Sequence, residues 1–117
     1  MNDHDDITYL RHIYDATVQI EEYTRHVTQK IFAQTPLLQD GVIRQLEIVG
    51  EATKRLSPLL RQQYSDIPWQ DIAGMRDKLI HDYFGVDVET VWLAATKDVP
   101  ELQRQIKEIL KDFGIDV

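Results

Sequence analysis

The residues best suited to chemistry lie close together, at Arg76, His81 and Tyr83. A histidine titrates near neutral pH and can take up or return a proton. An arginine is always charged, and its planar fork can hold a phosphate while negative charge grows on it. A tyrosine offers a ring on which a base can stack. These side chains suit RNA cleavage without a metal ion, in which a 2′-hydroxyl attacks the neighbouring phosphate.

Helix geometry decides how these side chains can meet. Successive helical residues advance by about 100°, so Arg76 and Tyr83 lie within about 20° of each other. Asp77 and His81, four residues apart, are close enough for the carboxylate to orient the imidazole. Arg76 and His81, however, lie about 140° apart on an ideal helix. We therefore expect two copies of the chain to share one cleft, in which one imidazole acts as base and the other as acid.

Each of these signals also has a structural interpretation. His81 could bond to a neighbouring helix while Arg76 pairs with a surface carboxylate, Asp71 or Asp82. Arg44, Glu47 and Glu51 share a helix face through their spacing of three and four, which favours an ion network over a direct role. As a secondary hypothesis, Arg44 lines the cleft and supplements Arg76. The histidines at positions 4, 12 and 26 are too scattered for a metal site, and we interpret them as surface or capping residues.

The pattern of apolar residues is helical throughout. A first helix is predicted over residues 5–33, with apolar residues at steps of three and four. Later helices are predicted to begin at Thr35-Pro36 and Ser57-Pro58, and another at Pro68-Trp69 is predicted to run to about residue 84. Asp87 should cap a short helix to about residue 97, and Asp98 with Glu101 forms a predicted capping box. The last helix should end near residues 113–114. The prediction is an all-α, antiparallel four-to-five-helix bundle, with residues 1–117 as a single domain and the first two long helices packed antiparallel.

Composition limits the possible functions. The chain has 117 residues, a net charge of −7 and no cysteine. It has no apolar run long enough for a membrane span, and its acidic start does not resemble a signal peptide, so a cytoplasmic location is expected. The acidic charge argues against non-specific binding of RNA, because phosphate contacts need cations. Residues 25–63 nevertheless carry six basic and three acidic side chains, a local excess that leaves room for RNA at one site.

The motif at residues 76–83 resembles the signature of the HEPN superfamily, and specifically its HepT-like ribonuclease toxins. The signature is an arginine, four residues, a histidine, one residue and a tyrosine. The flanking residues resemble that family as well, and so does a second segment, residues 44–52 in the second long helix. The resemblance therefore extends over most of the chain and rests on two separate motifs.

The resemblance implies a homodimeric helical bundle in which Arg76 and His81 are catalytic without a metal or cofactor, supported by Asp77, Lys78 and Arg44. It also implies a partner, an MntA-like nucleotidyltransferase antitoxin that transfers AMP from ATP to the motif tyrosine, which is Tyr83 here. Added phosphates would place negative charge where the RNA phosphate must bind. The sequence departs from the family pattern at Asp77, where asparagine is common, and between the histidine and the tyrosine, where a small residue is common.

The leading hypothesis is thus an endoribonuclease toxin of a toxin–antitoxin module that acts on RNA, with tRNA as a plausible structured substrate. One alternative is a non-catalytic nucleotide-binding or adaptor subunit of a nucleotidyltransferase complex, in which the same three residues hold nucleotide phosphates. A second alternative is a structural helical dimerisation module.

Overall fold

The structure is a computed structural model, and it describes residues 3–75, 77 and 87–117. Every regular element in this part of the chain is a helix, which confirms the all-α prediction. In chain order the elements are α1 (Asp3–Thr24), α2 (Gln29–Ala33), α3 (Pro36–Lys54), α4 (Pro58–Gln63), α5 (Trp69–Ala73), α7 (Val88–Leu93), the π-helical turn η1 (Ala94–Asp98) and α8 (Val99–Asp112).

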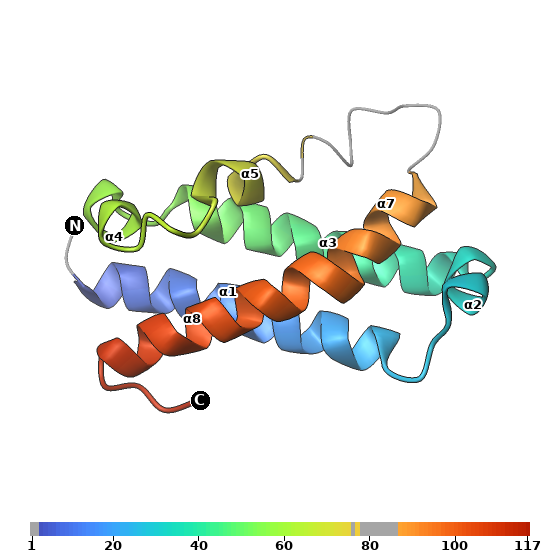
Figure 1. Cartoon of the computed structure of the whole chain (residues 1–117), viewed down its shortest axis with the longest axis horizontal. Helices are drawn as coiled ribbons and strands as arrows, with labels where there is room; N and C mark the ends of the chain where they lie inside the picture. Colours follow the sequence, from blue (N-terminus) through green and yellow to red (C-terminus); the bar gives the residue numbers. More distant parts are fainter. Residues whose placement is uncertain (1–2, 76, 78–86) are drawn as a thin grey trace.

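The two long helices α1 and α3 run antiparallel, as predicted (Figure 1). The end of α1 meets the start of α3 at Tyr23, whose ring lies against Gly41. A Cβ added at Gly41 would lie only 3.1 Å from Cε2 of that ring, so the missing side chain allows the close approach. The start of α1 meets the end of α3 through Asp6 and Ser57. Helix α8 crosses the pair and packs mainly on α1.

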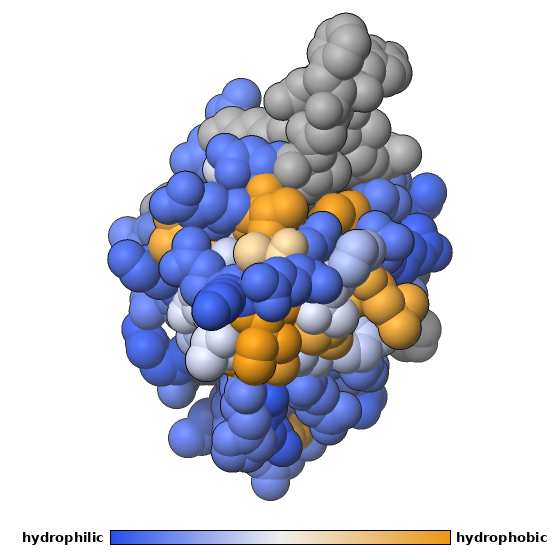
Figure 2. Space-filling view, turned by 90° about the vertical axis from the view of Figure 1, so that its right-hand side faces the viewer, coloured by the Kyte–Doolittle hydropathy of each residue, from blue (hydrophilic) through white to orange (hydrophobic). Residues whose placement is uncertain are grey.

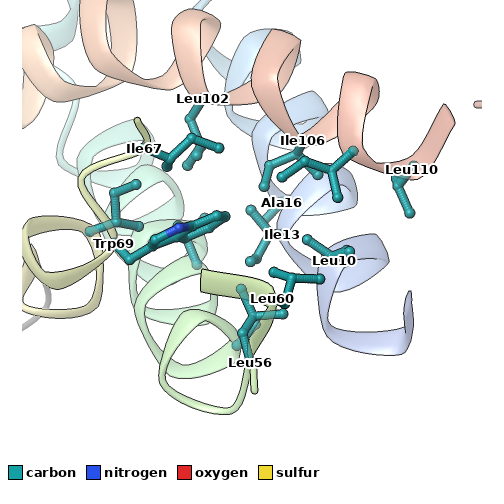
Figure 3. Close-up of a cluster of buried hydrophobic side chains, with 14 residues drawn as sticks. Leu10, Ile13, Ala16, Leu56, Leu60, Ile67, Trp69, Leu102, Ile106 and Leu110 are labelled. Atoms are coloured by element: carbon teal, nitrogen blue, oxygen red, sulfur yellow. The ribbon is translucent and has the colours of Figure 1, made fainter. Parts of the chain in front are cut away.

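One hydrophobic cluster joins five helices, α1, α3, α4, α5 and α8, at one end of the bundle (Figure 3). Helices α1 and α8 contribute one side of it, and the segment from the end of α3 to α5 contributes the other. Burial of such side chains supplies about 25 cal/mol per Å² of apolar surface. The labelled members are Leu10, Ile13, Ala16, Leu56, Leu60, Ile67, Trp69, Leu102, Ile106 and Leu110.

A second cluster fills the other end, where α2 and α7 close over α1 and α3. Phe32 of α2 is fully buried, and its ring centroid lies 5.2 Å from that of Trp92 in α7. Met75, the residue directly before Arg76, packs against this cluster. The first cluster therefore holds α5, and the second holds Met75, two residues beyond the end of α5.

A buried carboxylate ties the beginning of α1 to the beginning of α4. Asp6 is 4 % exposed, and its two oxygens accept hydrogen bonds from the Ser57 backbone N–H (2.8 Å) and the Ser57 hydroxyl (2.6 Å). The Ser57 oxygen in turn accepts a hydrogen bond from the Leu60 N–H and so caps α4, as predicted. Three buried polar groups satisfy one another in this way.

The predicted first helix, residues 5–33, is too long, because α1 ends at Thr24 and a second helix begins at Gln29. His26 there has a φ of 61°, a left-handed conformation that ends a helix. The side chain of Thr28 then accepts a hydrogen bond from the Ile31 N–H and starts α2 afresh. The apolar periodicity of the sequence continues from α1 into α2, but the local cap at Thr28 divides the segment into two helices.

The predicted capping box at Asp98 is also wrong. Asp98 has helical dihedrals (φ −75°, ψ −40°) and its side chain makes no capping hydrogen bond. Instead α7 continues into α8 through η1, where the Val99 N–H donates to the Ala94 carbonyl five residues back. Pro100 has no N–H and its ring crowds the carbonyl four residues earlier, so a widened turn accommodates it within one continuous helix.

The surface of the described residues is mostly hydrophilic. Figure 2 shows the end of the bundle with α2 and α7, where hydrophobic residues reach the surface among polar ones. The exposed large hydrophobic side chains include Ile31 of α2 and Leu37 at the start of α3. Isolated side chains of this kind are ordinary on a protein surface. Within the described residues, no helix is both long and apolar enough to cross a bilayer.

Replacing Asp6 by alanine should lower the free energy of unfolding by about 2 kcal/mol, because it leaves the buried N–H and hydroxyl of Ser57 without their acceptor. Urea denaturation followed by circular dichroism measures the change. Asp15→Ala is the matched control, since Asp15 is exposed on the same helix and should change the free energy by less than about 0.5 kcal/mol. Equal effects of the two substitutions would contradict the role given to Asp6.

Candidate functional site

Most of the predicted site residues lie outside the described part of the chain. These are Arg76, Lys78, His81 and Tyr83, whereas Asp77 and Arg44 are described. Asp77 is exposed to solvent. The structure also shows what anchors the chain on each side of the motif, in α5 before it and in α7 after it.

The anchor before the motif is Trp69 at the start of α5. Its indole Nε1–H donates to the Tyr64 carbonyl (3.0 Å), so its polar edge is satisfied while the ring is 6 % exposed. Ile72, one turn later, is equally buried in the first cluster, and Met75 packs on the second. The chain is therefore fixed up to the residue before Arg76.

Tyr64 links this anchor to α8. Its hydroxyl donates to Oδ2 of Asp112 (2.8 Å), while its carbonyl receives the Trp69 indole. Partial burial, the hydrogen bond to Asp112 and the negative charge of that carboxylate together raise the pKa of Tyr64 to about 12.

The anchor after the motif is the capped start of α7. Asp87 accepts hydrogen bonds from the N–H groups of Glu89 and Thr90, as the sequence predicted for its cap, and from the Thr90 hydroxyl (2.8 Å). The hydrogen bond from the Thr90 hydroxyl is the main cause of the lowered pKa of Asp87. Val91, one turn later, is fully buried. Both ends of the motif segment are thus attached to the core.

A groove of about 720 Å³ is lined by residues of both α5 and α7. Its walls are mainly apolar and also come from α3, η1 and α8, and they include Met75 and Leu93. Charged groups such as Lys97 and Glu101 also line it. A cavity of this size and character is typical of a binding site for a small molecule or a peptide side chain.

Arg44 lies in a different groove, formed by α1 and α3 alone. The two grooves share no lining residue. Nη1 of Arg44 is 3.6 Å from Oε2 of Glu47, as the predicted ion pairing along the helix requires. Nζ of Lys54, which the prediction did not include, is 3.8 Å from Oε1 of Glu51. Such exposed pairs contribute little to stability.

The sequence analysis missed two residues of this second groove, Tyr9 and His12 of α1. His12 is exposed, as its interpretation as a surface residue requires, and the structure adds that it lines this groove. The spacing of three places both rings on one helix face, but only the fold shows that this face lies opposite Arg44 and Arg55. Across residues 3–75, 77 and 87–117, no three His, Asp or Glu side chains are grouped as metal ligands would be.

Comparison with known proteins identifies the family. Residues 13–109 match the family model described as "Ribonuclease HepT-like". A protein of Caldanaerobacter subterraneus subsp. tengcongensis, named "Putative RNase TTE0752", is 44% identical over 103 residues, which are 88% of this chain and 92% of that protein. "Probable ribonuclease HepT" of Thermococcus cleftensis is 42% identical over 103 residues, covering 88% of this chain and 94% of that protein. The chain belongs to the HepT-like ribonuclease family.

A third relative is longer than this chain. "Gamma-glutamylcyclotransferase and putative RNase MJ0434" of Methanocaldococcus jannaschii is 45% identical over 105 residues, which are 90% of this chain but 47% of that protein. The chain spans about half of this relative, whose name combines two activities. No solved structure matches the chain.

The raised pKa of Tyr64 predicts a late-titrating tyrosine. Because the folded-state pKa of about 12 exceeds the ordinary value of 10.0, the stabilisation is present below pH 10 and is lost as the pH rises through 12. A tyrosinate absorbance titration should show one step near pH 12. Tyr64→Phe should remove this step and Asp112→Asn should move it lower, whereas Tyr23→Phe should keep it. A late step that survives in Tyr64→Phe would contradict the assignment.

Proposed function

We propose that this protein is a metal-independent endoribonuclease and the toxic component of a toxin–antitoxin module. The observation that carries the proposal is the Arg76, His81 and Tyr83 motif, which lies within the residues that match the HepT-like ribonuclease family. The relatives named as ribonucleases match this chain over about nine-tenths of its length. The anchors on both sides of the motif support it further, because a catalytic segment needs fixed ends.

The proposed reaction is transesterification within the RNA strand. One imidazole takes the proton from a 2′-hydroxyl, whose oxygen attacks the adjacent phosphorus and forms a new P–O bond. The bond from phosphorus to the 5′-oxygen breaks, and a second imidazole gives its proton to that leaving oxygen. The products are a 2′,3′-cyclic phosphate and a 5′-hydroxyl. The Arg76 guanidinium stabilises the charge of the pentacoordinate phosphorus, and no metal ion is needed for any of these steps.

The need for two imidazoles is the reason to propose a homodimer. One chain supplies one motif histidine, His81, and helix geometry separates it from Arg76 on an ideal helix. Two copies related by a twofold axis would bring two histidines and two arginines to one cleft. The apolar groove lined by Met75, the residue before Arg76, and by Leu93 supplies apolar surface for such a contact.

The proposed off-switch is AMP transfer to Tyr83 by a nucleotidyltransferase antitoxin. Each added AMP brings a phosphodiester charge and considerable bulk. In a site that must receive an RNA phosphate, this charge repels the substrate and the bulk excludes it. Asp77, which is exposed beside the motif, already adds negative charge there and would increase the repulsion.

A second candidate is a non-catalytic nucleotide-binding subunit of a nucleotidyltransferase complex. The same arginine, histidine and tyrosine could hold nucleotide phosphates without cleaving RNA. Cleavage by purified protein separates the two candidates.

Arg76→Ala and His81→Ala should each reduce the rate of RNA cleavage by at least about a hundredfold, because each removes charge stabilisation or proton transfer. The rate is measured on purified protein with end-labelled RNA in the presence of EDTA. Arg104→Gln is the control, since Arg104 is an exposed arginine of α8 paired with Glu101.

Wild-type rates in Arg76→Ala or His81→Ala would overturn the assignment, and loss of wild-type cleavage in EDTA would contradict the metal-free mechanism. Sedimentation velocity at the assay concentration should show a dimer. A protein that cleaves RNA as a monomer would exclude the shared cleft.

Co-expression with an MntA-like nucleotidyltransferase should add AMP to Tyr83 and abolish cleavage, because the modification fills the phosphate site. Intact-mass spectrometry and peptide mapping locate the added group. Tyr83→Phe should remain unmodified, whereas Tyr64→Phe, the control, should be modified like wild type. Full modification of Tyr83→Phe would show that the site is misassigned.

A further inference from the structure

We propose that the groove between α1 and α3 binds single-stranded RNA by recognising a guanine base. The groove has a volume of about 430 Å³ and is formed entirely by these two helices. This inference rests on the proposed function in assuming an RNA substrate, and it adds a second contact surface with base preference. Its lining residues are Tyr9, His12, Arg44, Glu47, Ile48, Glu51, Ala52 and Arg55.

The α1 side of the groove is aromatic. The rings of Tyr9 and His12 meet edge to face, with centroids 5.9 Å apart and planes at 83°. The Arg55 guanidinium lies over the Tyr9 ring, with Cζ 6.0 Å from its centroid. Aromatic rings and arginine planes are the surfaces on which unpaired bases stack. The Tyr9 and His12 rings would bind the flat face of a base.

The α3 side of the groove is charged and ordered along the helix. Arg44 and Arg55 are eleven residues apart, which is about 16 Å along the axis at 1.5 Å per residue. This distance exceeds what the phosphate of a single nucleotide can bridge, so a short strand is needed to contact both. Guanidinium groups hold phosphates through paired hydrogen bonds. The two arginines would therefore hold two phosphates of such a strand, with the recognised base between them.

The two glutamates between these arginines determine which base fits. Glu47 and Glu51 are one turn apart, and both line the groove. Carboxylates accept hydrogen bonds but donate none. Guanine presents two adjacent N–H donors on its Watson–Crick edge, at N1 and N2, which match the two oxygens of one carboxylate. The other bases place an acceptor beside their donor, and this acceptor would face a carboxylate oxygen and be repelled.

The Arg44–Glu47 ion pair does not prevent this exchange. Its separation, 3.6 Å, is longer than a hydrogen bond of about 2.9 Å. The Arg44 side chain is 69 % exposed, so it can turn to a phosphate with little loss. Guanine would then replace Arg44 as the partner of Glu47.

The test is a binding measurement that does not depend on cleavage. Five-nucleotide RNAs with 2′-O-methyl groups cannot be cleaved through a 2′-hydroxyl, so their affinity is measured by fluorescence anisotropy on the full chain. A strand with guanine at its centre and uracil elsewhere should bind about tenfold more tightly than one with adenine at the centre. Equal affinities would overturn the proposal.

Two variants separate the base contact from the phosphate contact. Glu47→Gln/Glu51→Gln should remove the guanine preference, because an amide offers one acceptor beside a donor. The ratio of affinities is the readout, since removal of two negative charges strengthens binding of every strand. Arg44→Gln should weaken both strands by a similar factor and keep the preference. Arg104→Gln should change neither, and circular dichroism confirms that each variant folds. A preference that survives in the double glutamine variant would overturn the proposal.

Guanosine 5′-monophosphate distinguishes the possible sources of the nucleotide. Weaker binding of the mononucleotide than of the guanine strand supports an RNA strand as the ligand, whereas equal binding contradicts the strand and leaves a free guanine nucleotide. Failure of this proposal leaves the ribonuclease proposal standing if the wild-type protein still cleaves RNA. Guanine-selective binding without any RNA cleavage would support the groove proposal and contradict the ribonuclease proposal.

Discussion

The hydrogen bonds from Ser57 to the buried Asp6 carboxylate fix the turn between α3 and α4 against the start of α1. They bring the start of α1 to the end of α3 and place the serine that caps α4. After α4, the Tyr64 hydroxyl donates a hydrogen bond to Asp112 of α8, and the Tyr64 carbonyl accepts one from the Trp69 indole. These hydrogen bonds and the first apolar cluster together position α5. Because a buried polar group is costly when unpaired, this chain of contacts defines one arrangement and disfavours others.

The helices were largely predictable because helical periodicity and capping are local. Ser57 and Asp87 cap helices through groups two or three residues away, which sequence spacing alone can reveal. The errors at Thr24 and Asp98 have the same origin. After Thr24 the left-handed His26 ended a helix whose apolar pattern continued, and at Asp98 a π-turn carried the helix through a sequence that resembles a cap. In both cases the local backbone conformation overrode the sequence pattern. The helix predicted from Trp69 to about residue 84 is also too long, because α5 ends at Ala73 with Gly74 as its C-cap.

The functional role of Arg76, His81 and Tyr83 stays a prediction, because these residues lie outside the described part of the chain. Their chemistry and the family resemblance both reside in one short segment, so spacing alone was enough to propose them. The groove of Arg44 could not be found in this way, because its aromatic wall comes from Tyr9 and His12, more than thirty residues earlier. That wall exists only when α1 packs antiparallel on α3. The Asp6 to Ser57 link, 51 residues apart, is invisible to spacing for the same reason.

The charge of the chain connects these features with the proposed activity. A protein with a net charge of −7 repels RNA from most of its surface, so binding depends on a few guanidinium groups at fixed places. In such a protein the carboxylates beside those guanidinium groups select among ligands, because a carboxylate accepts hydrogen bonds only from N–H or O–H donors. Glu47 would select hydrogen-bond donors in the α1–α3 groove, and the exposed Asp77 would select them within the motif. The same scarcity of positive charge supports the proposed modification of a single tyrosine as an off-switch, because one added phosphate would cancel much of the local attraction for RNA.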